Sequence, residues 1–170
     1  MSIQQEILTD FKAESKALIE QMVEILESLE DNPNQVEKLQ NYGNIVDRIM
    51  GGAKSIALEF ESTHNIHKVG DYAALCKAVG YKASSAKSNV QMLEICIALL
   101  QDATEVLEKM IDGLSEKNEM VVDRLISKTF LDRLSWVSAQ FKGDVKATVS
   151  SKDVNAVGDI DELMKKFGMK

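Results

Sequence analysis

The side chains most able to do chemistry lie on one predicted helix, and they are a carboxylate and amides. Glu37 and Asn41 stand one helical turn apart, with Gln40 beside them. On one helix face, a carboxylate and an amide can hydrogen-bond a water molecule and orient it for attack. Glu37, Gln40 and Asn41 are therefore the candidate catalytic residues. Because this spacing is common by chance in charged helices, a plain solvated surface is the alternative.

A polar face follows on the same predicted helix, well away from its apolar stripe at about 100° per residue. It includes Gly51, and glycine inside a helix costs about 1 kcal/mol relative to alanine. The adjacent Gly52 lies nearer the apolar edge and suits close helix packing, whereas Gly51 is better explained by a partner that must approach closely. Lys54 could pair loosely with Asp47. The alternative for Asp47 and Arg48 is a solvated face. The predicted docking residues are Asn44, Asp47, Arg48, Gly51 and Lys54.

The remaining reactive side chains are few. His64 and His67 are three residues apart, with Glu59 and Glu61 nearby, a spacing that could hold a metal. The chain has no other histidine, so a surface pair is favoured and no metal site is predicted. Phosphate-binding glycine-rich loops, nucleophile elbows and zinc motifs are absent. We expect both cysteines, Cys76 and Cys96, to be reduced core residues, since each lies within an apolar helical pattern.

Five amphipathic helices are predicted to position these residues, because apolar side chains recur at three- and four-residue steps. Asn34 could cap the second helix, and Gly80 lies near the end of the third. Short connections between long helices of this kind predict an antiparallel bundle. We therefore expect an all-α fold, with one domain over residues 1–142. The predicted helices cover residues 7–29, 36–61, 66–80, 93–114 and 126–141.

Composition limits the kind of partner and the compartment. The 170 residues carry a net charge of −7 and 45% hydrophobic side chains, which suits one core but not nucleic acid, since phosphate binding needs clustered lysine and arginine. Apolar runs fall well short of the roughly 20 residues that cross a bilayer, so no membrane partner is expected. No charged-then-apolar leader precedes the helices. We expect a cytoplasmic protein.

After residue 142 the helical pattern stops. Residues 143–158 show no sustained apolar period and are predicted to form a flexible linker. Residues 159–170 have the pattern of a short amphipathic helix, whose acidic amino end suits the helix dipole. Its apolar face would be left in water unless it docks on a partner. The alternative is a tail that folds back onto its own bundle. The predicted tail-docking residues are Asp159, Ile160, Asp161, Leu163, Met164 and Phe167.

The segment Asp47-Arg48-Ile49-Met50-Gly51-Gly52-Ala53-Lys54-Ser55 resembles the phosphoacceptor helix of the histidine-phosphotransfer (HPt) domain of the chemotaxis kinase CheA. Aspartate replaces the reactive histidine and methionine replaces the usual lysine. The resemblance covers roughly residues 5–140. It implies an HPt-like antiparallel four-helix bundle, here with an additional C-terminal helix and a tethered short helix, that docks a CheY-like receiver domain. Since Asp47 cannot form a phosphoimidazole, phosphotransfer through this position is not expected.

The last segment, Ile160-Asp161-Glu162-Leu163-Met164-Lys165-Lys166-Phe167-Gly168-Met169, resembles the CheY-docking helix of the chemotaxis phosphatase CheZ. CheZ acts through an acidic residue and a glutamine four positions later; Glu37 and Asn41 are the nearest analogue here. This resemblance implies a receiver-binding protein in two-component or chemotaxis signalling that accelerates dephosphorylation, with Mg²⁺ supplied by the receiver and no cofactor of its own. Two alternatives remain, a non-catalytic adaptor or sequestering scaffold and a structural protein that forms a homodimer through its fifth helix.

Overall fold

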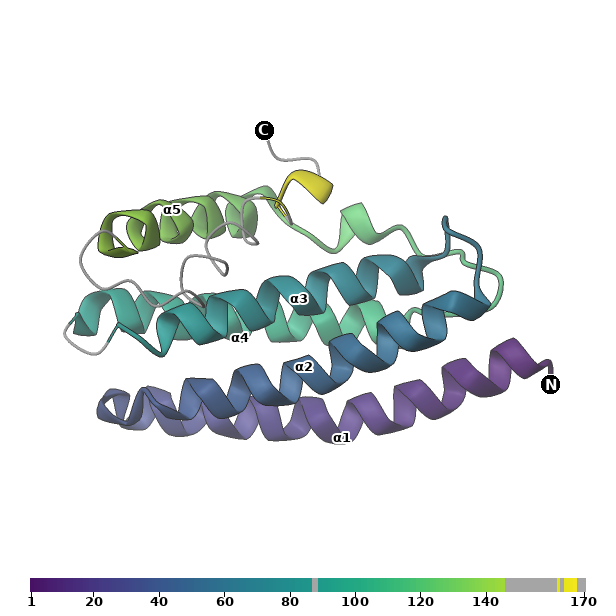
Figure 1. Cartoon of the computed structure of the whole chain (residues 1–170), viewed down its shortest axis with the longest axis horizontal. Coiled ribbons are helices and arrows are strands. Elements are labelled where there is room, and N and C mark those ends of the chain that lie inside the picture. Colours follow the sequence, from purple (N-terminus) through teal and green to yellow (C-terminus); the bar gives the residue numbers. More distant parts are fainter. Residues whose placement is uncertain (87–88, 146–161, 163, 168–170) are drawn as a thin grey trace.

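The computed structural model describes residues 1–86, 89–145, 162 and 164–167, and within these ranges every regular element is helical (Figure 1). The prediction of an all-α fold is confirmed. Three short 3₁₀ turns, Pro33–Gln35, Ala57–Glu59 and Val122–Arg124, lie in the connections. The long helices are α1 (Ile3–Asp31), α2 (Lys38–Ile56), α3 (Asn65–Ala83), α4 (Val90–Asp112) and α5 (Lys128–Val145).

The first four helices surround one core. α2 packs on α1 and α3, and α4 packs on the same two helices. Polar contacts show that α1 and α4 run in opposite directions. Lys12 near the start of α1 donates to the carbonyl oxygen of Asp112 at the end of α4, and Gln101 in α4 donates to Glu30 at the far end of α1. The fifth helix lies over α3 and α4 on the side away from α1 (Figure 1).

Two buried tyrosines tie the middle of the core to α4. Tyr72 of α3 donates its hydroxyl proton to the carbonyl oxygen of Ala103, at 3.1 Å. The hydroxyl of Thr104 donates to the carbonyl of Leu100. Because a hydroxyl has one proton, its oxygen must accept the 2.9 Å hydrogen bond from the hydroxyl of Tyr42 on α2. Burial raises the pKa of both phenols well above the ordinary value.

The helices α2 and α3 approach each other closely because each places a glycine opposite a tyrosine of the other. A Cβ atom added to Gly43 would lie 2.7 Å from the ring of Tyr81, and one added to Gly80 would lie 2.9 Å from the ring of Tyr42. Both distances are too short for a real contact, so these two positions need glycine. Gly80 therefore serves packing, and it lies near the end of α3, as predicted, because the helix ends at Ala83.

His64 connects the start of α3 to the loop after α4. Its Nδ1 accepts the backbone N–H of Ile66, as an N-cap side chain does, and its Nε2 lies 2.9 Å from the carbonyl oxygen of Ser115, so the proton is on Nε2. Its ring also packs on Phe60, with centroids 4.4 Å apart. Both ring nitrogens are thus occupied. His64 is buried, which contradicts the predicted surface pair. No group of three metal-ligating side chains occurs among the described residues.

Cys76 and Cys96 are both free and buried, as predicted. Burial raises the pKa of each thiol from 9.0 to about 12. Over the part of the chain that the structure describes, we find no helix with the length and apolar character that crossing a membrane requires.

The carboxyl-terminal region differs from its predicted boundaries. α5 extends to Val145, three residues into the stretch predicted to be a linker, and the rest of that stretch lies outside the described residues. Within 159–170, positions 164–166 are helical. This short piece, drawn in yellow in Figure 1, lies near the start of α5 on the same side of the bundle.

Candidate functional site

The candidate catalytic and bundle-docking residues lie on one face of α2 and at Glu37, which directly precedes it, because the apolar stripe of α2 is turned into the core. Leu39, Val46, Ile49 and Ala53 are buried. Side chains between these positions therefore point outward. Asp47 is half-buried, and the other candidates are exposed, namely Glu37, Gln40, Asn41, Asn44, Arg48, Gly51 and Lys54.

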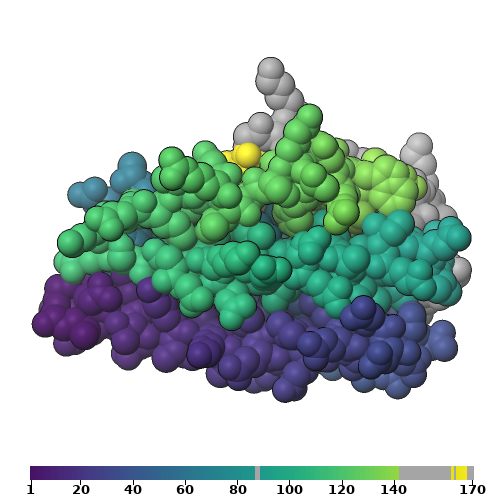
Figure 2. Space-filling view, turned by 180° about the vertical axis from the view of Figure 1, so that it is seen from behind, coloured from purple at the N-terminus to yellow at the C-terminus, as the bar shows by residue number. Residues whose placement is uncertain are grey.

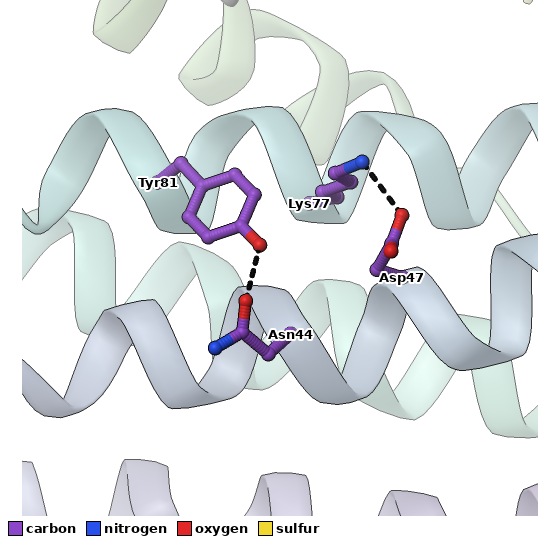
Figure 3. A network of polar contacts seen from close by, with 4 residues as sticks. All are labelled: Asn44, Asp47, Lys77 and Tyr81. Atoms are coloured by element: carbon purple, nitrogen blue, oxygen red, sulfur yellow. Dashed lines mark hydrogen bonds and ion pairs between the residues drawn. The ribbon is translucent and has the colours of Figure 1, made fainter. Parts of the chain in front are cut away.

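The neighbouring helix α3 supplies partners for two of these residues (Figure 3). The hydroxyl of Tyr81 donates to the side-chain oxygen of Asn44 at 2.5 Å. The ammonium of Lys77 donates to Asp47 at 2.6 Å, in a pair whose side chains are 30% and 46% exposed respectively. Asp47 is thus held by α3 and does not stand alone on the surface. Arg48 lies 3.8 Å from Glu14 of α1, and both side chains are largely exposed.

The loose pairing of Asp47 with Lys54 was wrong. Asp47 pairs with Lys77 instead, and Lys54 is turned toward Gly70 of α3, where an added Cβ would lie 3.3 Å from its side-chain Cγ. Lys54 takes part in none of the ion pairs that the structure describes. We call the line where these helices meet the α2–α3 seam, formed by Asn44, Asp47, Gly51 and Lys54 of α2 and Gly70, Ala74, Lys77 and Tyr81 of α3.

The seam has little side-chain bulk at its centre. Asp47 faces Lys77 and Lys54 faces Gly70, so α2 and α3 run antiparallel here and Gly51 lies between these two contacts along α2. A Cβ atom added to Gly51 would meet nothing within 4 Å. Packing therefore gives no reason for glycine at this position. Gly52 differs, since its added Cβ would lie 3.4 Å from the ring of Phe11, in line with the packing role expected for it.

Charge divides the bundle into two sides. α1 carries eight carboxylates against two lysines, and α4 carries five against one. The seam helices are basic, although the whole chain is acidic. Figure 2 shows the opposite side of the molecule, where α1 and α4 lie. α2 and α3 together have two acidic residues, Asp47 and Asp71, and six basic ones, Lys38, Arg48, Lys54, Lys68, Lys77 and Lys82.

The three candidate catalytic residues lie at the amino-terminal end of α2. Glu37 is the residue that precedes the helix, and its side chain makes no capping hydrogen bond. In the hydrogen bonds that the structure describes, the side chains of Gln40 and Asn41 have no partner. All three are exposed, so their own fold does not shield them from bulk water.

The described part of the tail packs on the chain's own bundle. Met164 is buried at 8% exposure. The ring of Phe167 meets that of Tyr72 edge-on, with centroids 5.8 Å apart. Lys166 lies 3.2 Å from Asp71. The predicted docking residues Asp159, Ile160, Asp161 and Leu163 lie outside the described residues.

Sequence reasoning missed Lys77 and Tyr81. Their spacing of four residues places them on one helix face, but nothing in the sequence says which helix that face meets. Comparison with known proteins adds no further assignment. The chain matches no protein-family model, and neither the curated proteins nor the solved structures contain a significant match.

Proposed function

We propose that this protein is an HPt-like antiparallel bundle without the phosphoacceptor histidine, and that it binds a CheY-like receiver domain through the α2–α3 seam. The observation that carries the proposal is Gly51. This residue is exposed within a helix, where it costs stability, and no neighbour requires its lack of a side chain. If the backbone of a partner comes close to α2 here, a side chain at position 51 would block it, which explains the glycine.

The charge of the seam supports the same partner. A receiver domain holds its phosphoryl group on an acidic site with Mg²⁺, so its docking face suits a basic patch more than an acidic one. On this protein the two helices that form the seam, α2 and α3, carry six basic residues against two acidic ones, whereas α1 and α4 are acidic. Opposite charges speed encounter and disfavour wrong orientations. The Mg²⁺ belongs to the receiver.

Asp47 decides which activity is excluded. Asp47 cannot form a phosphoimidazole, and it is paired with Lys77. The protein therefore modulates two-component or chemotaxis signalling through binding and not through histidine phosphotransfer. Acceleration of receiver dephosphorylation is a second candidate activity. It is favoured by the exposed Gln40 and Asn41, which are available to orient a water molecule, with Glu37 beside them.

A bulky side chain at Gly51 tests the docking face. We expect Gly51→Trp to lower the affinity for a CheY-type receiver from the same organism at least about tenfold, a loss of about 1.4 kcal/mol. The melting temperature should not fall, because the space is open. The control is Ala17→Trp, an exposed position on α1. Isothermal titration calorimetry measures the receiver affinity of both variants, and thermal unfolding measures their melting temperatures. Equal affinities for the two variants would contradict docking at the seam.

The rate of phosphate loss from the same receiver separates the two activities. If the amides act on water, the protein accelerates the loss, and Gln40→Ala or Asn41→Ala abolishes the acceleration while binding is retained. Binding with an unchanged rate would leave an adaptor or sequestering protein.

A further inference from the structure

Residues 164–167 occupy a defined place on the bundle. We call this place the tail site and define it by Asp71 and Tyr72 of α3 and Phe130 of α5. The rings of Phe167 and Tyr72 meet edge-on, and the ring of Tyr72 also lies 6.3 Å from that of Phe130. Lys166 pairs with Asp71 at 3.2 Å. Met164 is removed from water. Apolar and charged contacts thus act together to hold this segment.

The contact is small, which makes it reversible. Burying Met164 and partly burying Phe167 favours the docked state, but ordering the segment costs conformational entropy of similar size. The ion pair adds little, because the side chain of Lys166 is 56% exposed. We therefore expect docked and undocked tails to exchange.

The residues buried at the tail site are the same ones that a partner would need. Met164 and Phe167 belong to the apolar face of the amphipathic segment, together with Ile160 and Leu163. A protein that takes such a segment as a helix in a groove buries that face. One side chain cannot be buried in two places, so docking on the bundle and docking on a partner exclude each other.

The tail site also borders the proposed receiver surface. Asp71, which holds Lys166, directly follows Gly70, and Gly70 faces Lys54 across the α2–α3 seam. A receiver seated on the seam would therefore lie beside the docked tail. A tail released there is at high effective concentration for a second contact with the same receiver.

We infer that the tail site holds the C-terminal segment as an autoinhibitory contact, which competes with the receiver domain for the apolar face of that segment. This inference rests on the proposed function. The fraction of chains with the tail docked on the bundle reduces the apparent affinity for the receiver, since only the undocked tail can bind it.

The test uses the full chain labelled with ¹³C at the methionine methyl groups. The Met164 methyl signal is identified by its loss in Met164→Leu, and its position is compared with that in a free peptide of residues 159–170. We expect the two positions to differ. Asp71→Lys should move the signal toward the peptide position, and Lys166→Glu in the same chain should move it back by restoring an ion pair of reversed sign. Asp10→Lys on the exposed face of α1 makes the same change of charge and should move nothing.

Receiver titration of the same variants completes the test. Asp71→Lys should bind the receiver about two- to fivefold more tightly than the unaltered chain, in keeping with the strength of a surface ion pair. A Met164 signal at the peptide position in the unaltered chain, or equal receiver affinities, would overturn the inference. If no variant binds a receiver while Met164 remains docked, the proposed function fails, and the competition fails with it.

Discussion

Gly51 and Gly80 are both helical glycines, but their surroundings differ. Gly51 has open space where a side chain would start, whereas a Cβ atom added to Gly80 would lie 2.9 Å from the buried ring of Tyr42. We expect Gly51→Ala to raise the free energy of unfolding by up to about 1 kcal/mol through helix propensity. Gly80→Ala should lower it by about 1–3 kcal/mol through overpacking. Urea unfolding followed by circular dichroism measures both. Changes of the same sign would contradict this account.

At the residue scale, the sequence predicted which helix face a residue lies on, but it did not predict which residue of another helix that residue contacts. The periodicity of α2 separated exposed Gly51 from packed Gly52, because helix geometry alone determines which side a position faces. The ion pair of Asp47 was misassigned to Lys54. Seven residues span about 10 Å along a helix, and the lysine of the adjacent helix, Lys77, reaches the carboxylate at 2.6 Å. Such a pair depends on inter-helix register, which no local pattern records. The docking role of these residues stays a prediction.

At the element scale, His64 caps the start of α3 and contacts the loop that follows α4. His64→Ala removes the acceptor for the N–H of Ile66, the contact with Ser115 and the stacking on Phe60. We expect it to lower the free energy of unfolding by about 1–3 kcal/mol. His64→Asn should cost less, since asparagine is among the best N-cap residues. Thermal unfolding of the three proteins gives the order. An asparagine variant no more stable than the alanine variant would refute the capping role.

Helix existence was predictable, and helix ends were less so. Apolar side chains at helical spacing predicted all five helices, and α3 is buried on more than one face because α2 and α4 both pack on it. Asn34 was expected to cap α2, but it lies in the 3₁₀ turn Pro33–Gln35, and Glu37 precedes the helix without a side-chain cap. Gly80 lies near the end of α3, as predicted, and its packing on Tyr42 explains why this residue is glycine.

At the scale of the whole molecule, buried thiols and phenols make stability depend on alkaline pH. Burial raises the pKa of Cys76 and of Cys96 from 9.0 to about 12, and it raises the pKa values of Tyr42 and Tyr72 as well. Between pH 9 and about pH 12, the two thiols lose their protons in the unfolded chain but keep them in the folded chain. The free energy of unfolding should therefore fall as pH rises above about 9, by up to about 1.4 kcal/mol per pH unit for each group.

Cys96→Ala removes one of these groups and should make the alkaline decline shallower by that amount. Urea titrations at several pH values between 8 and about 11 measure the slope. An unchanged slope in this variant would show that Cys96 does not contribute.

The most direct test of the central claim is a map of where a receiver domain contacts the bundle. The full chain, labelled with ¹⁵N, is titrated with an unlabelled CheY-type receiver from the same organism, and backbone amide shifts are recorded. Docking at the α2–α3 seam predicts changes that centre on Asn44, Gly51 and Lys77, with the outer faces of α1 and α4 unaffected. Changes confined to α1 and α4, or none at saturating receiver, would contradict the claim.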